Sequence, residues 1–220
     1  MIEIKNLYKS FRQPLFVNAD MIIYNGRKTY IRGINGCGKS VLLKMIIGYS
    51  RPDEGTITAD GYKIGIDGDF LKDAGVSINA PEFIPELTGM ENLLELAAIR
   101  KKASKEDIMN LARKLYFEED IDKQYRIFSL GMRQKMRVIQ ALMDRPRYVI
   151  LDEIFDALDD VSKEALQKLL NDYLKENPQR YVIYTSHENQ MDQFADQTFL
   201  IKDCSVVEYK EGRSTISRGE

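Results

Sequence analysis

The stretch Gly33-Ile-Asn-Gly-Cys-Gly-Lys-Ser40 carries a glycine, a second glycine five residues later, and then a lysine and a serine. This spacing is that of the phosphate-binding loop known as the Walker A pattern, and all four fixed positions are filled. Glycines let such a loop fold around a phosphate with its N–H groups pointing inward. The N-terminus of the helix that follows adds a partial positive charge. The stretch therefore predicts an α/β fold in which a strand, this loop and a helix follow one another.

The whole stretch is expected to surround the phosphates of a nucleotide. Its members are Gly33, Ile34, Asn35, Gly36, Cys37, Gly38, Lys39 and Ser40. Lys39 would bridge the β- and γ-phosphates as a point charge, and Ser40 would place its hydroxyl on Mg²⁺. Cys37 stands at a variable position of the pattern, where packing is its expected role. The dipoles of the loop would also make the Cys37 thiol somewhat acidic.

Strand and helix patterns alternate on both sides of this loop. The expected strands are residues 2–8, 16–24, 28–32, 147–151, 181–185, 199–201 and 206–209, with a hairpin over 56–66. Expected helices cover 41–47, 132–143 and 161–174. Thr88-x-x-Glu91 and Ser104-x-x-Asp107 are capping signals for two more helices. The sequence therefore predicts an α/β core with a helical lobe inserted at about residues 82–145.

Composition excludes several classes of protein. The net charge is -2 and the pI about 5.7, which is no electrostatic footprint for a nucleic acid. No apolar run approaches the ~20 residues that span a bilayer. The chain opens on an alternating, strand-like pattern rather than on a signal peptide. We expect a cytoplasmic protein with reduced cysteines and no nucleic-acid partner.

The apolar run 147–151 ends in two carboxylates, Asp152 and Glu153. A continuous apolar run is typical of a buried parallel strand. If both belong to one parallel sheet, this strand is expected to lie beside the strand of the phosphate loop, and both motifs would face one crevice at the carboxyl end of the sheet. Asp152 would then hold the metal ion through its hydration shell, and Glu153 would orient or deprotonate the attacking water.

Three further motifs resemble those of the ABC-type ATPases. Phe128-Ser-Leu-Gly-Met-Arg-Gln-Lys135 resembles the signature motif of that family, Ala157-Leu158-Asp159 its D-loop, and Thr185-Ser186-His187 its switch-histidine segment. The order of the motifs is that of the family, and the resemblance covers residues 2–209. The signature departs from the common Leu-Ser-Gly-Gly-Gln form, but similar forms occur in small export and immunity ATPases.

The resemblance implies roles for four residues. Ser129 and Gly131 would contact the γ-phosphate of an ATP held by an opposite subunit, at a helix N-terminus that favours an anion. Asp159 would line the interface of the dimer. His187, the single histidine of the chain, would contact the γ-phosphate and help to hold the water.

Two further positions follow from the same resemblance. Phe11 matches the aromatic residue that stacks on adenine, with Tyr8 as the alternative. Asn79, in the segment 74–81, stands where the family usually has a glutamine that contacts Mg²⁺. Because asparagine is one methylene shorter, a water molecule would bridge it to the metal.

The resemblance implies a fold and a function. The fold would be a P-loop NTPase core with an N-terminal antiparallel β-subdomain and an inserted α-helical subdomain. Its single domain, 1–220, would divide into an ATP-binding core (1–81 and 146–210), a helical subdomain (82–145) and a polar tail (211–220). The chain would dimerise, with itself or with a paired ATPase subunit, around two Mg-ATP.

It would thereby drive a separate transmembrane permease from the cytoplasmic face of the membrane, as the ATPase of an exporter of drugs, bacteriocins or peptides. Residues 78–96 are the expected docking surface. The alternatives are a soluble, non-transport ABC ATPase and a regulatory module that binds ATP. Neither the cargo nor the direction of transport follows from the sequence.

Overall fold

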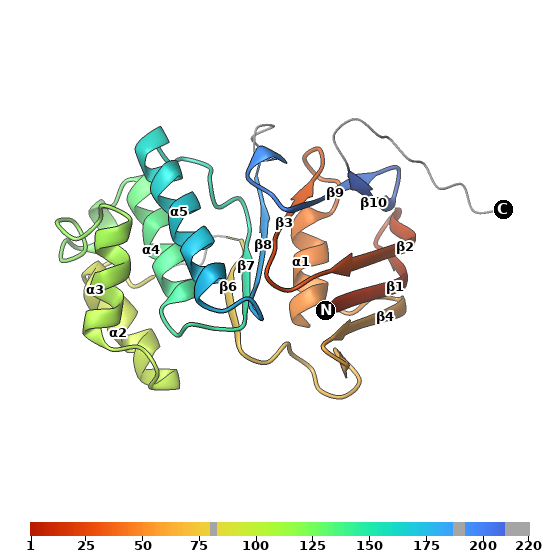
Figure 1. Ribbon diagram of the computed structural model, residues 1–220, viewed down its shortest axis with the longest axis horizontal. Coiled ribbons are helices and arrows are strands. Elements are labelled where there is room, and N and C mark those ends of the chain that lie inside the picture. Colours follow the sequence, from red (N-terminus) through yellow and green to blue (C-terminus); the bar gives the residue numbers. More distant parts are fainter. Residues whose placement is uncertain (80–82, 187–191, 210–220) are drawn as a thin grey trace.

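The computed structural model describes residues 1–79, 83–186 and 192–209. Its strands are β1 (Ile2–Ser10), β2 (Pro14–Ile23), β3 (Lys28–Arg32), β4 (Glu54–Ala59), β5 (Tyr62–Lys63), β6 (Ala74–Ser77), β7 (Tyr148–Leu151), β8 (Tyr181–Thr185), β9 (Gln197–Lys202) and β10 (Ser205–Tyr209). Its helices are α1 (Lys39–Ile47), α2 (Gly89–Arg100), α3 (Lys105–Lys114), α4 (Leu130–Leu142) and α5 (Asp160–Glu176), with a 3-10 turn at Tyr125–Ile127. Strand, phosphate loop and helix follow one another as the sequence predicts (Figure 1).

The strands form two sheets. The smaller sheet is antiparallel, with the order β2-β1-β4-β5. The larger has the order β10-β9-β3-β8-β7-β6, in which β9, β3, β8, β7 and β6 are mutually parallel and β10 is an antiparallel edge. The N-terminal antiparallel sheet and the parallel core of the expected fold are therefore both present.

One expectation about the sheet is wrong. Strand β7, which carries Asp152 and Glu153 at its end, does not lie beside β3, because β8 lies between them. Residue Tyr184 of β8 pairs with Tyr30 of β3 on one side and with Leu151 of β7 on the other. Both motifs still end at the carboxyl edge of the sheet, with the end of β8 between them.

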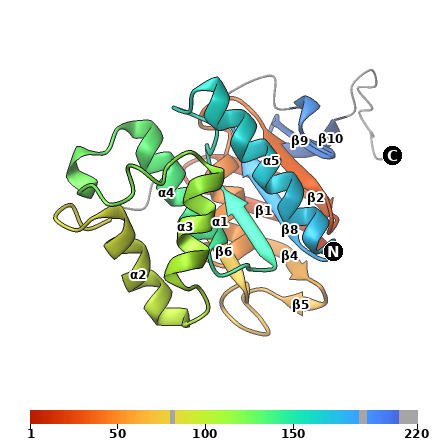
Figure 2. The same ribbon diagram turned by 60° about the vertical axis from the view of Figure 1, so that its left-hand side comes forward.

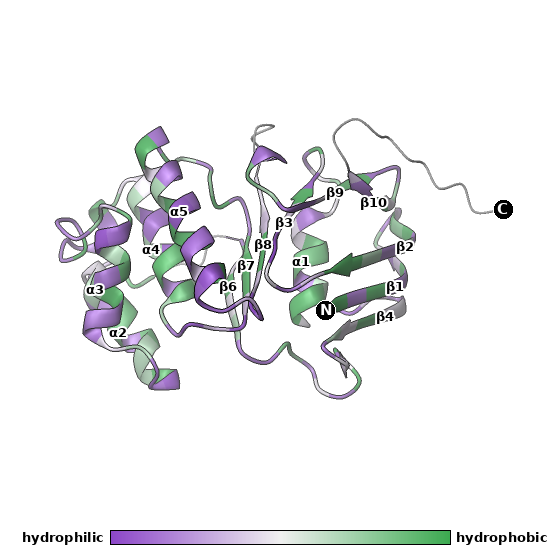
Figure 3. Cartoon of the chain, in the orientation of Figure 1, coloured by the Kyte–Doolittle hydropathy of each residue, from purple (hydrophilic) through white to green (hydrophobic). Residues whose placement is uncertain are grey.

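The larger sheet is covered on both faces (Figures 1 and 2). Side chains alternate between the two faces of a strand. Val149 and Leu151 accordingly pack with the helices α2–α5, whereas Tyr148 and Ile150 pack with α1 and the smaller sheet. Strand β7 is buried at all four residues for this reason. The helices that cover the larger sheet carry both hydrophilic and hydrophobic residues along their length (Figure 3).

The helical region begins with the two predicted caps. In α2 the Thr88 hydroxyl accepts from the amide of Glu91, and the Glu91 carboxylate accepts from the amide of Thr88. Ser104 and Asp107 make the same reciprocal pair at the start of α3. The helices α2, α3 and α4 lie between β6 and β7 in the chain. The exact division into a core, a helical subdomain (82–145) and a tail stays a prediction, and the tail lies outside the described residues.

Strand β6 is not predicted from the sequence. Its four residues, Ala74–Ser77, include a glycine and have no apolar run. A Cβ at Gly75 would stand 1.8 Å from the carbonyl oxygen of Ala141, so glycine is required for α4 to pack against this strand. Close backbone approach accounts for a strand whose composition is unfavourable.

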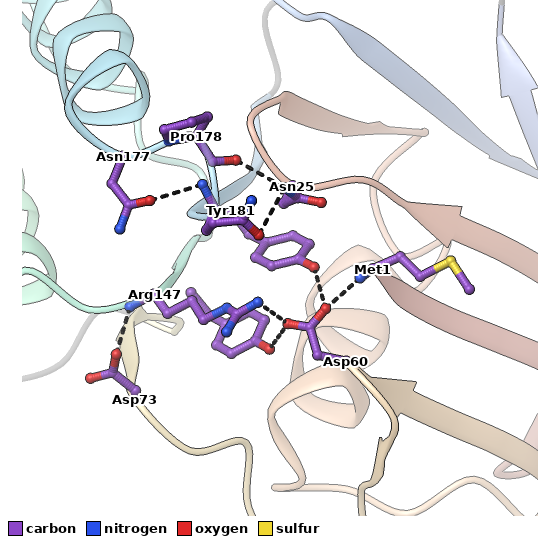
Figure 4. A network of polar contacts seen from close by, with 10 residues as sticks. Met1, Asn25, Asp60, Asp73, Arg147, Asn177, Pro178 and Tyr181 are labelled. Carbon is purple, nitrogen blue, oxygen red and sulfur yellow. Dashed lines mark hydrogen bonds and ion pairs between the residues drawn. The ribbon is translucent and has the colours of Figure 1, made fainter.

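A polar network ties the smaller sheet to the larger one (Figure 4). The carboxylate of Asp60, in the β4–β5 turn, accepts hydrogen bonds from the phenols of Tyr148 and Tyr181, at 2.5 and 2.8 Å. It also forms ion pairs with Arg147, at 2.7 Å, and with the amino group of Met1.

Among the described residues, no helix has the length and apolar character needed to cross a bilayer.

Candidate nucleotide site

The phosphate loop connects β3 to α1 and is shaped by close packing. Gly38 has a φ of 106°, and a Cβ there would stand 2.9 Å from the ring of Phe16. An L side chain would be strained at this position on both grounds. Helix α1 starts directly after it, with the amide of Leu42 bonded to the carbonyl of Gly38. The N-terminus of α1 therefore adjoins the loop, where its dipole would favour an anion.

Lys39 is buried and folded back onto the loop. Its Nζ donates to the carbonyl oxygens of Gly33, at 2.9 Å, and Ile34, at 3.4 Å. Only 6% of Lys39 is exposed, so its ammonium is held at the loop rather than in solvent. A phosphate in the loop would offer this cation a charged acceptor in place of neutral carbonyls.

Cys37 is a packing residue, and the expected acidity of its thiol is wrong. The Sγ atom stands 2.4 Å from the point that a Cβ on Gly33 would occupy. Burial raises the pKa of the Cys37 thiol, and the nearby charge of Lys39 offsets this effect in part. Both Cys37 and Cys204 are free thiols.

Two adjoining cavities lie at this edge of the sheet. The first, of about 420 Å³, is lined by Phe11, Leu15, Asn35, Gly36, Gly38, Lys39, Ser40, Val41 and Glu153. The second, of about 250 Å³, is lined by Ser40, Asn79, Leu130, Gln134, Arg137, Asp152, Glu153, Asp156 and Ala157. Ser40 and Glu153 line both. The structure thus brings the phosphate loop, the acidic pair, Asn79 and the start of α4 to one place.

The rim of the first cavity carries Phe11. Its side chain is 68% exposed, and the ammonium of Lys9 lies 5.4 Å from the ring centre. Tyr8, the alternative for stacking on adenine, does not line this cavity and is half-buried in β1. An exposed ring beside a phosphate loop suits stacking on a base, which favours Phe11.

The acidic pair is held by the end of strand β8. Thr185 donates its hydroxyl to Oδ1 of Asp152, at 2.6 Å, and its Oγ1 accepts the amide of Glu153, at 2.8 Å. The amide of Asp152 donates to the carbonyl of Ser77, at 2.7 Å. Glu153 itself is exposed and has a φ of 53°, a left-handed conformation that is rare for residues other than glycine. The backbone around both carboxylates is therefore fixed by specific bonds.

Asn79 has a positive φ as well, of 55°. Asparagine adopts the left-handed conformation more readily than glutamine does, because its short side chain bonds locally. The backbone supplies a physical reason for the shorter residue at this position. Asn79 also lines a separate groove between the larger sheet and α2, so it stands between that groove and the acidic cavity.

Ser129 and Gly131 stand at the start of α4. Ser129 is exposed and caps the helix, with its Oγ accepting the amide of Met132 at 3.2 Å. A serine hydroxyl can still donate to an anion while it accepts this bond. Asp159 caps α5 in the same way, by accepting the amide of Ser162 at 2.7 Å. The Ser162 bonds lower the pKa of the Asp159 carboxyl.

His187 lies outside the described residues, and its role stays a prediction. Two residues of this site, Gln134 and Thr185, have no role in the sequence-based prediction. Thr185 ends a strand, and polar residues at the carboxyl ends of parallel strands are the signal that would have found it. Gln134 lies within the motif 128–135 that resembles the signature, but nothing in that motif predicts its contact with Glu153.

Comparison with known proteins identifies a family model described as "ABC transporter", which matches residues 16–156, more than half of the chain. An uncharacterised ABC transporter ATP-binding protein of Bacillus subtilis, YybJ, is 32% identical over 193 residues, covering 86% of this chain and 87% of that protein. The bacitracin transport ATP-binding protein BcrA of Enterococcus faecalis is 29% identical over 211 residues, covering 94% and 68%.

A relative of another transport type is similar at the same level. The spermidine/putrescine import ATP-binding protein PotA of Chromobacterium violaceum is 30% identical over 192 residues, covering 86% of this chain but about half, 53%, of its own length. Among solved structures, the dimeric structure of MJ0796, a bacterial ABC transporter cassette, superposes with a TM-score of 0.83 at 24% identity. The superposition covers 96% of this chain and 98% of that one, which shows a shared fold.

Proposed function

This chain belongs to the ABC transporter family and is an ATP-binding subunit of that family, and we propose that it hydrolyses ATP to drive a separate membrane-spanning chain. One observation carries the proposal. The phosphate loop and the acidic pair line adjoining cavities that share Ser40 and Glu153. A nucleotide whose phosphates lie in the loop would therefore present its terminal phosphate to the carboxylates.

ATP would be held by three kinds of contact. The loop amides and the N-terminus of α1 would bind the phosphates, and Lys39 would exchange its carbonyl partners for phosphate oxygens. Phe11 would stack on adenine at the exposed rim of the cavity.

A magnesium ion fits the residues that line the second cavity. Mg²⁺ prefers oxygen ligands and keeps several waters, so one or two protein ligands beside phosphates suffice. Ser40 and Asp152 would hold it, with Asn79 nearby through water. In the described part of the chain no group of three His, Cys, Asp or Glu side chains forms a metal site, which a phosphate-bound magnesium does not require. When bound, the ion would neutralise charge that develops on the phosphates.

Glu153 would act as the general base. Its carboxylate is exposed where both cavities meet, and its backbone is fixed by Thr185. Such a carboxylate is suited to accept a hydrogen bond from water aimed at the terminal phosphate. His187 would assist at the same phosphate.

A second copy of the chain, or a paired subunit, would complete each site. Ser129 is exposed at a helix N-terminus, where a hydroxyl and the helix dipole favour a phosphate from another chain. Gly131 and Asp159 would lie at the same interface. ATP would then join two chains, and its hydrolysis would release them.

The membrane partner would occupy a groove of about 770 Å³ beside α2. This groove is lined by residues 74–76, 78, 79, 83 and 84, by α2 and by the C-terminal part of α4. It therefore includes part of the expected docking segment. Ile84 and Ile99 expose 52% and 76% of their side chains there. Exposed apolar surface in a groove is suited to bind another protein. Asn79 lines both this groove and the second cavity of the nucleotide site. Binding of the membrane partner in the groove would therefore depend on whether a nucleotide is bound. The chain would thus work at the cytoplasmic face of the membrane.

We infer export of drugs, bacteriocins or peptides rather than import. The similarity to the bacitracin transport protein covers 94% of this chain and 68% of that protein, against 86% and 53% for the spermidine/putrescine import protein. A soluble, non-transport ABC ATPase or a regulatory ATP-binding module would bind ATP without a permease. A membrane-spanning chain encoded beside this one, and co-purifying with it, would separate these alternatives.

The variant Glu153→Gln tests the proposal. Loss of the base should lower the rate of ATP hydrolysis by about a hundredfold or more, with nucleotide affinity retained. The variant should also accumulate as an ATP-dependent dimer, measured by gel filtration with light scattering. Normal hydrolysis by this variant, without a trapped dimer, would contradict the assignment of the base.

A further inference from the structure

Gln134 lies in the second turn of α4 and is 5% exposed. Its Nε2 donates to the main-chain carbonyl of Glu153, at 2.7 Å. Its Oε1 accepts from a guanidinium nitrogen of Arg137, at 3.0 Å. These two partners determine the orientation of the amide, since a rotated amide would place oxygen against oxygen and N–H against N–H.

The residue that Gln134 holds is in an unfavourable conformation. Glu153 has a φ of 53°, a left-handed conformation that is unfavourable for an L residue. Thr185 accepts the amide on one side of this residue, and Gln134 donates to its carbonyl on the other. A strained residue at a functional site persists only where its surroundings restrain it. The two bonds contribute to that restraint, together with the amide of Asp156, which donates to the same carbonyl at 3.3 Å.

Helix α4 contacts the acidic loop at a second point on the same face. Gly131 precedes Gln134 by three residues, so the two lie one above the other on the helix. A Cβ at Gly131 would stand 3.0 Å from the carbonyl oxygen of Ala157, in the loop that follows Glu153. The helix capped by Ser129 therefore approaches this loop at two points. Gln134 bonds the carbonyl of Glu153, and Gly131 packs against the carbonyl of Ala157.

We propose that Gln134 is a positioning residue, which aims the Glu153 carboxylate by holding its carbonyl and couples it to the helix that begins at Ser129. This inference rests on the proposed function of Glu153 and Ser129. In a dimer, Ser129 would contact the ATP of the opposite chain, whereas Glu153 of the same chain acts on its own ATP. Through Gln134, α4 and Glu153 move as one unit, so that engagement of one nucleotide aligns the base for the other.

Two variants of Gln134 test the proposal. Gln134→Met keeps the length of the side chain and removes both hydrogen bonds. Gln134→Glu keeps an oxygen that accepts from Arg137 but sets a second oxygen against the Glu153 carbonyl. Gln167→Met is the matched control, because Gln167 is half-buried on the neighbouring α5 and lies outside the site.

Both Gln134 variants should lower kcat by roughly tenfold or more, because the base is misaimed, while KM for ATP changes less than about twofold. Both should also accumulate the ATP-dependent dimer, as Glu153→Gln does, since binding is intact and hydrolysis is slow. The control should behave like the wild type.

Three outcomes are decisive. An unchanged kcat in both variants overturns this inference and leaves the proposed function standing. A loss of kcat that comes with loss of the dimer and a lower urea midpoint does the same, because it would show that Gln134 is only a structural residue. A wild type without ATPase activity, and a Glu153→Gln variant without a dimer, overturn the proposed function and this inference with it.

Discussion

Thr185 shows how one side chain can organise a site. Its hydroxyl donates to the Asp152 carboxylate and accepts the Glu153 amide, so a single oxygen spaces the two acidic residues. The residue is fully buried, and water cannot replace either bond. A buried N–H without an acceptor costs about 1–3 kcal/mol.

The change Thr185→Val should therefore damage both stability and activity. Valine has the same shape but neither donates nor accepts, so the Glu153 amide loses its partner. We expect about 1–2 kcal/mol lower stability in urea unfolding and a roughly tenfold lower kcat.

Thr29→Val is the matched control for this prediction. Thr29 is also fully buried, on the adjacent strand β3, and its hydroxyl has no hydrogen-bond partner among residues 1–79, 83–186 and 192–209. The same substitution there should leave kcat unchanged and keep or raise stability. Equal effects of the two substitutions would show that shape, and not the hydroxyl, matters at Thr185.

At the scale of secondary structure, the sequence predicts the ends of helices correctly where they are set by hydrogen bonds between near neighbours in the chain. Both predicted capping boxes are present, and α1 ends at Gly48, which has a φ of 90°. Strand β6 is missed, because its register and packing depend on α4, which is distant in the chain. Capped helices are thus predicted from neighbours in sequence, and so are buried strands with an apolar run, whereas a strand without such a run, β6, is not.

Removal of the α2 cap by Thr88→Ala should cost about 1 kcal/mol of unfolding free energy, because the amide of Glu91 loses its acceptor. Urea unfolding measures the loss. Since the site and α4 are untouched, kcat for ATP should stay within about twofold. A stability equal to that of the wild type would show that the cap contributes nothing here.

At the scale of the whole molecule, Asp60 joins the two sheets (Figure 4). Burial alone would raise the pKa of its carboxyl, but hydrogen bonds from Met1, Tyr148 and Tyr181 hold that pKa below its ordinary value of 3.8. The contribution of the ionised carboxylate is therefore fully present above pH 3.8 and is lost as the pH falls through the lower value in the folded protein.

The variant Asp60→Asn should be less stable than the wild type by about 1–2 kcal/mol near neutral pH. The difference should stay constant down to about pH 5 and shrink at lower pH. Urea unfolding of both proteins across this range measures it. A difference independent of pH down to acid unfolding would contradict the role of the charge.

Short sequence motifs determine which chemical groups the nucleotide site contains. Residues 33–40, the acidic pair and the capped helices follow from spacing and residue type, because backbone hydrogen bonds and φ preferences act between near neighbours. The arrangement of these motifs is a different matter. The position of β8 between β3 and β7 follows from packing of long segments, and so does the approach of Gln134 to Glu153, 19 residues away. Thr185 lies 33 residues from Asp152 in the chain yet donates to it directly. Contacts of this kind arise only when distant surfaces are buried together, and no local pattern specifies which polar groups then meet.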